Sequence, residues 1–261
     1  MVTLYEHPLS PYAQKVKIAL REKGVPFDLV LPDVMGSGAA GSQFMRAIPR
    51  GEVPALVDGD TTVFDSTIIL EYIEDKWPTP ALLPKSPADR ARVRMIEEIM
   101  DTHYEAINWG LGELGWFKRA EGELADTLLS NAKRQTLGFF SWLEGQLGDR
   151  AWFNGDAFGW GDLSVAPYVG ASMVLGIPPA APSTLNAWFD RVMLRPAANQ
   201  TITEARAFKT ADSNVADLVA QGLFKRLYRD HRLEWMIKSG GLDVVLKGLK
   251  ADNIRFAPDF E

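Results

Sequence analysis

Residues 1–31, MVTLYEHPLSPYAQKVKIALREKGVPFDLVL, decide the fold. Residues 2–6 form a short apolar run that favours a β-strand. Over residues 11–23 apolar side chains recur at helical spacing, and Gly24 ends that pattern. Residues 25–31 are again apolar and predict a second strand. The chain therefore opens with a β-α-β unit.

A β-hairpin and a helix complete this first region. Residues 55–57 and 61–64 are two short strands joined by Asp58-Gly59-Asp60, which contains a favoured tight-turn dipeptide. Residues 66–76 return to helical spacing. A short helix is also expected around residues 43–47. The predicted order of elements is βαβαββα.

A proline-rich segment separates this region from the remainder. Four prolines fall in the ten residues 78–87, which is typical of a stiff linker. Strand signals nearly vanish after it. Helical patterns cover residues 89–119, 121–146, 162–175, 185–194, 214–238 and 242–249. We therefore expect an α/β domain over residues 1–78, a linker over 79–88 and an all-helical domain over 89–261.

Composition limits the classes of function. With 46% apolar and 24% charged residues, the chain has the balance of a globular protein. A net charge of -6 argues against a nucleic-acid partner, because phosphate binding needs clustered Lys and Arg. No apolar stretch approaches the length of a membrane span, and the N-terminus lacks the features of a signal peptide. We expect a cytoplasmic protein with no membrane partner.

The absence of cysteine narrows the chemistry further. The chain can form no disulfide, no thiolate metal site and no cysteine nucleophile. No His, Asp or Glu set has metal-ligand spacing, so no metal is expected. Any thiol chemistry must use a thiol from outside the protein.

Ser10-Pro11-Tyr12 is the first candidate for chemistry, because it lies where the first strand passes into the first helix. Serine followed by proline is a common helix start, so Ser10 is an N-cap on the plainest interpretation. The same geometry also serves chemistry. The positive end of the helix and the hydroxyl together favour a bound thiolate.

Two further segments lie at the starts of other predicted elements. A cis bond at Val53–Pro54 would leave the Val53 backbone turned outward to pair with an extended peptide, whereas a trans bond is a simple strand start. Asp65-Ser66 begins a helix, where amide groups and a hydroxyl bind a carboxylate and an aspartate binds an ammonium group. A helix N-cap is the structural alternative there.

Together these segments carry a family resemblance. The runs SPYAQKVKIALREKGVPF, PRGEVPALVDGD and FDSTIILEYIED resemble the glutathione-binding half of the cytosolic glutathione transferases, and FNGDAFGWGDLSVAPYV resembles their second domain. The resemblance covers about residues 1–205 and is closest to the serine types of plant and bacterial enzymes. It implies a thioredoxin-like α/β domain followed by an all-α domain, with glutathione as co-substrate.

The resemblance also implies roles for individual residues. Ser10 donates a hydrogen bond to the glutathione thiolate, although other classes place a tyrosine near the start of the first strand, where Tyr5 lies. Val53 pairs with the cysteinyl backbone, and Pro54 is a cis proline. The γ-glutamyl end falls to Asp65 and Ser66.

Two positions depart from the family pattern. Lys or Gln often precedes Val53 near the glycyl carboxylate, whereas this chain has Glu52, and Arg50 is a substitute. In the second domain, Gly159 replaces the Ser or Thr of a capping box and Asp162 keeps its acid. We expect Asp162 to be structural and to accept hydrogen bonds from amides of the preceding loop.

The electrophile pocket of the family lies between its domains. By analogy its walls include Tyr12, His103, Tyr104, Trp109, Trp116 and Phe117. Aromatic residues at helical spacing also occur in ordinary cores. The C-terminal extension is either a helix over the cleft, a contact with a neighbouring subunit or a solvated helix.

Three functions follow from these observations. The leading hypothesis is a transferase that adds glutathione to a small hydrophobic electrophile, with a homodimer as the expected assembly. The second is a binding or regulatory protein of the same fold without catalysis, which Glu52 favours. The third is a glutathione-dependent isomerase.

Overall fold

The computed structural model describes the chain except residues 33–43, 45–47, 49–50, 209–214, 228–229 and 256–261. It divides into two compact units. The first unit contains Met1–Pro32, Glu52–Asp101 and Gly138–Lys209. The second unit contains Asp33–Gly51, Thr102–Leu137 and Thr210–Glu261.

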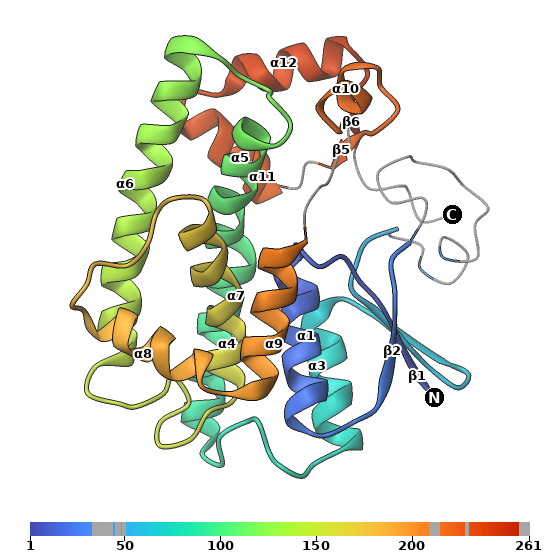
Figure 1. The fold of residues 1–261 in the computed structure, drawn as a ribbon, viewed down its shortest axis with the longest axis vertical. Coiled ribbons are helices and arrows are strands. Elements are labelled where there is room, and N and C mark those ends of the chain that lie inside the picture. The colour runs from blue at the N-terminus through green and yellow to red at the C-terminus, as the bar shows by residue number, and fades with distance from the viewer. Residues whose placement is uncertain (33–43, 45–47, 49–50, 209–214, 228–229, 256–261) are drawn as a thin grey trace. The chain divides into compact units, whose positions relative to one another are not determined.

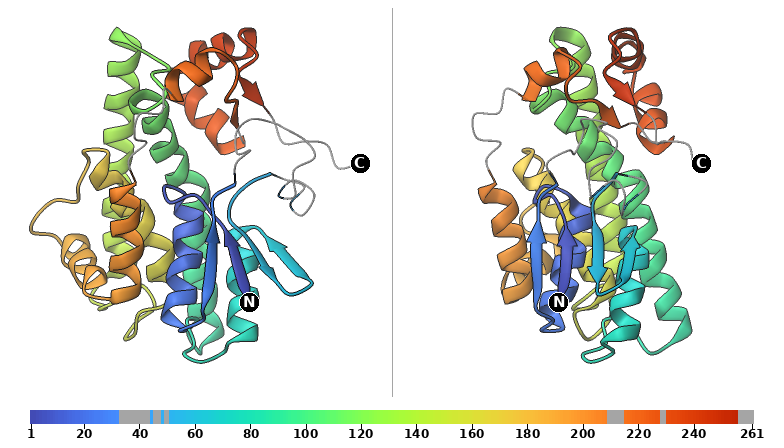
Figure 2. Two further views of the ribbon diagram at one scale, coloured as in Figure 1. Left: turned by 45° about the vertical axis from the view of Figure 1, so that its right-hand side comes forward. Right: turned by 90° about the vertical axis from the view of Figure 1, so that its right-hand side faces the viewer.

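The first unit contains a four-stranded mixed sheet that lies at one side of its helices (Figures 1 and 2). The strands lie in the order β2-β1-β3-β4, and β1 pairs parallel with β2 and antiparallel with β3. Their bounds are β1 Val2–Tyr5, β2 Phe27–Val30, β3 Ala55–Asp58 and β4 Thr61–Phe64. All four predicted strands are confirmed. The short helix predicted around residues 43–47 falls mostly outside the described residues.

Helix α1, Pro11–Glu22, lies beside α3, Ser66–Lys76, against the sheet (Figure 1). It also packs against α7, Trp160–Val174, and α9, Pro196–Ala207. Every residue from Ala13 to Leu20 is consequently buried. The sequence pattern of one apolar stripe predicts a single buried face for α1. In the structure α1 is instead covered on all sides.

Two lysines of α1 are therefore buried, and each has carboxylate partners. The Lys17 side chain is 1% exposed, and its Nζ lies 3.2 Å from Glu6 and 3.4 Å from Glu204. Arg21, one turn further on, also pairs with Glu204 at 2.7 Å. Burial of an unpaired ammonium group would be far too costly, so the pairing is a condition of the packing.

The remaining elements are mostly helices. Those that the structure describes are α4 Pro87–Ile99, η1 Met100–Tyr104, α5 Glu105–Gly115, α6 Gly122–Leu147, α8 Thr184–Met193, α10 Val215–Ala220, α11 Asp230–Lys238 and α12 Leu242–Lys250, with the two-residue strands β5 Arg226–Leu227 and β6 Ile254–Arg255. None of the described helices is both long and apolar enough to cross a bilayer.

One long predicted helix is wrong in its continuity, and the other changes its geometry. Over residues 89–119 the chain stays helical through Gly115, but the turn η1 between α4 and α5 is π-helical. The pattern over residues 214–238 breaks after α10, where Gly222 adopts a positive φ of 73°. A glycine in this conformation commonly ends a helix.

In the second unit, α11 packs closely against α5. A Cβ placed on Gly110 of α5 would lie 2.5 Å from the Trp235 ring of α11, so only glycine fits there. The Trp235 indole donates a hydrogen bond to Gln135 of α6 at 2.5 Å. These contacts join α11 to both helices.

The start of α7 confirms the structural role expected for Asp162. Its carboxylate accepts hydrogen bonds from the backbone amides of Phe153 (2.8 Å), Asn154 (3.3 Å) and Gly159 (3.1 Å). It also accepts one from the Trp188 indole at 2.8 Å. One buried acid thus organises the loop before α7.

The missing cap hydroxyl at Gly159 has a physical explanation. A Cβ at this position would lie 2.0 Å from the Asn154 side chain and 2.2 Å from the Leu82 carbonyl. The Asn154 amide donates to that carbonyl at 2.7 Å, and its oxygen accepts from the Gly161 amide at 3.1 Å. Asn154 therefore caps α7 from outside the helix.

Restoring the family residue with Gly159→Ser should destabilise the protein by about 2 kcal/mol, because the side chain overlaps Asn154 and Leu82. Urea unfolding measures the change. Gly138→Ala is the control, since Gly138 lies in α6 with no atom near its Cβ position, and this change should stabilise by about 0.5–1 kcal/mol. A Gly159→Ser protein as stable as the wild type would contradict the close approach.

Candidate functional site

The sheet register brings the three candidate segments to one end of the sheet. Tyr5 of β1 is paired with Ala55 of β3, and Ala55 is paired with Phe64 of β4. Ser10 lies in the loop after β1, Val53–Pro54 directly precedes β3, and Asp65–Ser66 directly follows β4. The sequence spacing alone does not reveal this register.

Ser10 is the N-cap of α1, with Pro11 at the first helical position. Its Oγ accepts a hydrogen bond from the Ala13 amide at 3.3 Å, and its own amide donates to the His7 carbonyl at 2.8 Å. A hydroxyl that accepts through a lone pair keeps its proton for donation. The capping role and the thiolate-binding role expected for Ser10 are therefore compatible.

The Val53–Pro54 bond is cis, as the family resemblance implies. Pro54 is buried, whereas Glu52 and Val53 are half-buried. Arg50 lies outside the described residues. The roles of these residues toward glutathione stay predictions.

Asp65 has an unusual backbone conformation, with φ 73° and ψ 124°. Its Oδ1 accepts hydrogen bonds from the amides of Thr67 at 3.1 Å and Ile68 at 3.4 Å, which makes it the N-cap of α3. The adjacent Ser66 is 5% exposed. Such a conformation costs about 1–3 kcal/mol in a residue other than glycine and is found most often at binding sites.

A buried ion cluster lies behind Ser10, on the same helix. The Lys15 side chain is 0% exposed, and its Nζ lies 2.5 Å from both Glu97 and Asp101. The Tyr168 hydroxyl donates to the second oxygen of Asp101 at 2.8 Å. One lysine thus faces two carboxylates.

Glu97 connects this cluster to the start of α3. It accepts hydrogen bonds from Thr67 at 3.0 Å and from the Trp160 indole at 2.5 Å, in addition to Lys15. Thr67 directly follows Ser66. A single carboxylate of α4 therefore holds both α1 and α3, the two helices whose first residues are the site candidates.

The charges of the cluster do not balance if all three groups are ionised. Burial raises the pKa of Asp101 to about 6; the Lys15 charge opposes this shift and the Glu97 charge reinforces it. Burial acts to lower the pKa of Lys15, but the two carboxylates outweigh it and the pKa is raised. Lys15 is therefore the fixed charge, and Asp101 is the group that exchanges a proton near neutral pH.

The residues expected to line the electrophile pocket fall in different places. Tyr12 lies in the first unit, where its hydroxyl donates to the Asp101 carbonyl at 2.7 Å and its ring meets the Tyr168 ring edge-on. The others, in the second unit, are His103, Tyr104, Trp109, Trp116 and Phe117. Their roles toward an electrophile stay predictions.

In the second unit these residues have distinct surroundings. Tyr104 is fully buried, whereas Trp116 is 37% exposed. The Trp109 ring has the guanidinium groups of Arg226 at 5.5 Å and Arg232 at 5.0 Å. The remaining rings are paired, His103 with His231 and Phe117 with Phe224.

The ion cluster is the part of the site that sequence reasoning missed. The sequence signal for this cluster is Lys15-Val16-Lys17. These two lysines belong to a helix that lies between two strands in the sequence and is therefore expected to pack against them. Glu97 and Asp101, four residues apart, share one helical face. Among the described residues, no group of three or more His, Asp or Glu is placed to hold a metal ion.

Comparison with known proteins establishes the family. A model of the glutathione S-transferase N-terminal domain matches residues 4–81, and a model of the C-terminal domain matches residues 114–191. Glutathione S-transferase 1 of Dianthus caryophyllus is 34% identical over 172 residues, which cover 65% of this chain and 76% of that protein. The chain belongs to the glutathione S-transferase family, and several proteins that it resembles are named as glutathione transferases.

Other similar proteins indicate the range of the fold. A stringent starvation protein A homolog of Coxiella burnetii is 28% identical over 213 residues, covering 79% of this chain and 94% of its own. A glutathione S-transferase structure from Rhodospirillum rubrum has a TM-score of 0.70 at 26% identity, covering 84% and 99% of the two chains. One from Methylobacterium radiotolerans, in complex with glutathione sulfonate, has a TM-score of 0.62 at 28% identity, covering 77% and 94%.

Asp101→Asn should change the pH dependence of stability. The native pKa of about 6 lies above the ordinary 3.8, so between these values the native state keeps a proton that the unfolded state has lost. The stabilisation is complete at low pH and is lost as pH rises through about 6. The advantage of wild type over the variant should therefore fall by roughly 3 kcal/mol between about pH 4 and pH 7.

Urea unfolding at several pH values measures this difference. Asp58→Asn is the control of opposite sign, because the hydrogen bond from Lys76 lowers the pKa of Asp58. The stability advantage of wild type over Asp58→Asn should therefore decrease toward acid pH. A pH-independent difference between wild type and Asp101→Asn would rule out a proton held by Asp101.

Proposed function

We propose that the protein binds glutathione at the end of the sheet where Ser10, Val53 and Asp65 lie, and stabilises its thiolate with the Ser10 hydroxyl. The observation that carries this proposal is the Ser10 geometry. Its oxygen caps α1 through a lone pair while its proton remains for donation. The positive end of α1 adds to the preference for an anion.

The thiolate then attacks a small hydrophobic electrophile. In a displacement, a carbon–sulfur bond forms while the bond to a halide or aryl ether oxygen breaks, and that group leaves with the electron pair. In a conjugate addition, the new carbanion takes up a proton. The chain has no cysteine, so exchange with a protein thiol is not part of this chemistry.

The chain itself supplies binding, orientation and charge stabilisation. Val53 is proposed to pair with the cysteinyl backbone, and Asp65 with Ser66 to hold the γ-glutamyl end. For the electrophile, the family resemblance indicates Tyr12, His103, Tyr104, Trp109 and Trp116, of which Tyr104 is fully buried. A solved relative in complex with glutathione sulfonate supports this ligand class.

A non-catalytic role is the second candidate. One similar protein is named a stringent starvation protein A homolog and not a transferase, which motivates this candidate, as does Glu52 near the expected position of the glycyl carboxylate. A glutathione-dependent isomerase uses the same thiolate and differs only in releasing glutathione unchanged. We further propose a cytoplasmic homodimer, on the resemblance to cytosolic transferases.

Ser10→Ala should leave glutathione bound but raise the thiol pKa of the complex by at least about one unit, worth roughly 1.4 kcal/mol. Ultraviolet absorbance of the thiolate against pH measures it. Ser86→Ala is a matched control, because Ser86 caps α4 and also precedes a proline. Both variants should lose about 1 kcal/mol of stability through the cap, but only Ser10→Ala should shift the thiol pKa.

Two results would reject the proposal. An unchanged thiol pKa in Ser10→Ala would exclude Ser10 as the donor and direct attention to Tyr5. No binding by the wild type at millimolar glutathione would favour the non-catalytic role.

Asp65→Asn should weaken glutathione binding roughly tenfold, because it removes the charge that faces the α-ammonium group. Asparagine is also a good N-cap, so the stability of α3 should change little. Calorimetric titration measures affinity, and thermal unfolding checks stability. Unchanged affinity would show that Asp65 serves only as a cap.

A further inference from the structure

Helix α12 has an exposed apolar face on its outer side. Leu242, Leu246 and Leu249 are 46%, 53% and 47% exposed. Their spacing of four and three residues places them in one row along the helix, which we call the leucine face. Single exposed leucines are common, whereas a contiguous exposed apolar row is typical of an interaction surface.

The folded protein does not need the leucine face for its own core. Val244, Val245 and Gly248 are the buried positions of α12 and lie on another side of the helix. At Gly248 a Cβ would lie 2.5 Å from both Arg119 and Ile254, so that side is already closely packed. The leucine face is available for a partner.

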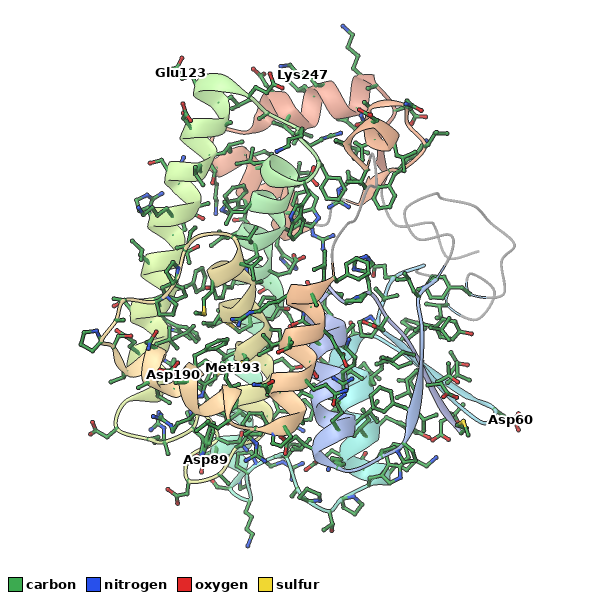
Figure 3. All side chains as sticks on the ribbon, in the orientation of Figure 1. Asp60, Asp89, Glu123, Asp190, Met193 and Lys247 are labelled. Atoms are coloured by element: carbon green, nitrogen blue, oxygen red, sulfur yellow. The ribbon has the colours of Figure 1, made fainter. Side chains whose placement is uncertain are left out.

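Charged residues border the leucine face in a specific order. Asp243 follows Leu242, and Lys250 follows Leu249, so the two charges lie two turns apart along one edge. Neither has an ion-pair partner among the residues that the structure describes. Lys247 lies between them and is labelled on α12 in Figure 3.

This order of charges is self-complementary. If two α12 helices pack antiparallel about a two-fold axis, Leu246 meets its own copy at the centre and Leu242 meets Leu249. On the bordering edge, Asp243 of each copy then faces Lys250 of the other. In a parallel two-fold arrangement the charged edges of the two copies would lie on opposite sides of the contact, so Asp243 and Lys250 could not pair across it.

We propose that the leucine face binds the α12 of a second copy of this chain in this antiparallel arrangement. The proposal is independent of glutathione binding. It concerns a segment beyond the family match, because the C-terminal domain model ends at residue 191. Three leucines per copy make a small interface, so the association is weak and depends on concentration.

Sedimentation velocity of the full-length protein from about 5 to about 300 µM tests the proposal, since weak interfaces associate in this range. The wild type should show a concentration-dependent step above its smallest assembly. Leu246→Glu should weaken the association roughly tenfold or more, because each of the two copies then places a carboxylate at the centre of the contact. The matched control is Leu137→Glu on α6, where the leucine is 47% exposed, and it should behave as wild type.

A charge-reversal series tests the orientation and keeps the leucines intact. Asp243→Lys and Lys250→Asp should each weaken association roughly threefold or more, because each change places like charges opposite one another at two symmetric sites. The double variant D243K/K250D should restore it. Circular dichroism confirms that each variant is folded.

Three results would overturn the proposal. A wild-type mass that does not change with concentration would exclude the association. Equal behaviour of Leu246→Glu and Leu137→Glu would exclude the leucine face. Failure of the double variant to recover would exclude the antiparallel pairing.

Discussion

Burial of two lysines within α1 is the constraint on which the first unit depends. The sheet and α3, α7 and α9 enclose this helix, so the Lys15 and Lys17 side chains are 0% and 1% exposed. An ammonium group in such surroundings must be paired. The carboxylates come from distant parts of the chain, Glu97 from α4 and Glu204 from α9. The packing of the sheet against the later helices is therefore specified by charge as well as by shape.

The same pairing positions the candidate site. Glu97 is bonded to Lys15 of α1 and to Thr67 of α3, so one carboxylate fixes the starts of the two helices that follow Ser10 and Asp65. A thiolate gains from a helix N-terminus only if the donors are already aimed at it. The ion cluster is buried away from solvent, and its hydrogen bonds to α1 and α3 hold the starts of these helices in place. Its excess carboxylate, Asp101, holds a proton up to about pH 6.

Local patterns in the sequence predicted the strands, the hairpin, α1 and α3, and the family resemblance implied the cis Pro54 and the structural role of Asp162. These features depend on residues close together in the chain or on a family motif. The π-helical turn η1, helix α9 and the Lys15 cluster were missed because they depend on contacts between distant segments, which periodicity does not encode. Gly159 shows the same limit: the cap that it lacks is provided by Asn154, and the sequence gives no sign of that substitution.

A crystal structure of the protein with glutathione would show whether the start of α1 binds the sulfur. We predict the sulfur at about 3.0–3.5 Å from Ser10 Oγ, within hydrogen-bonding distance for sulfur. We also predict the cysteinyl backbone beside Val53 and the γ-glutamyl end at Asp65 and Ser66. A sulfur bound to the Tyr5 hydroxyl, or no glutathione at this end of the sheet at millimolar concentration, would contradict this prediction.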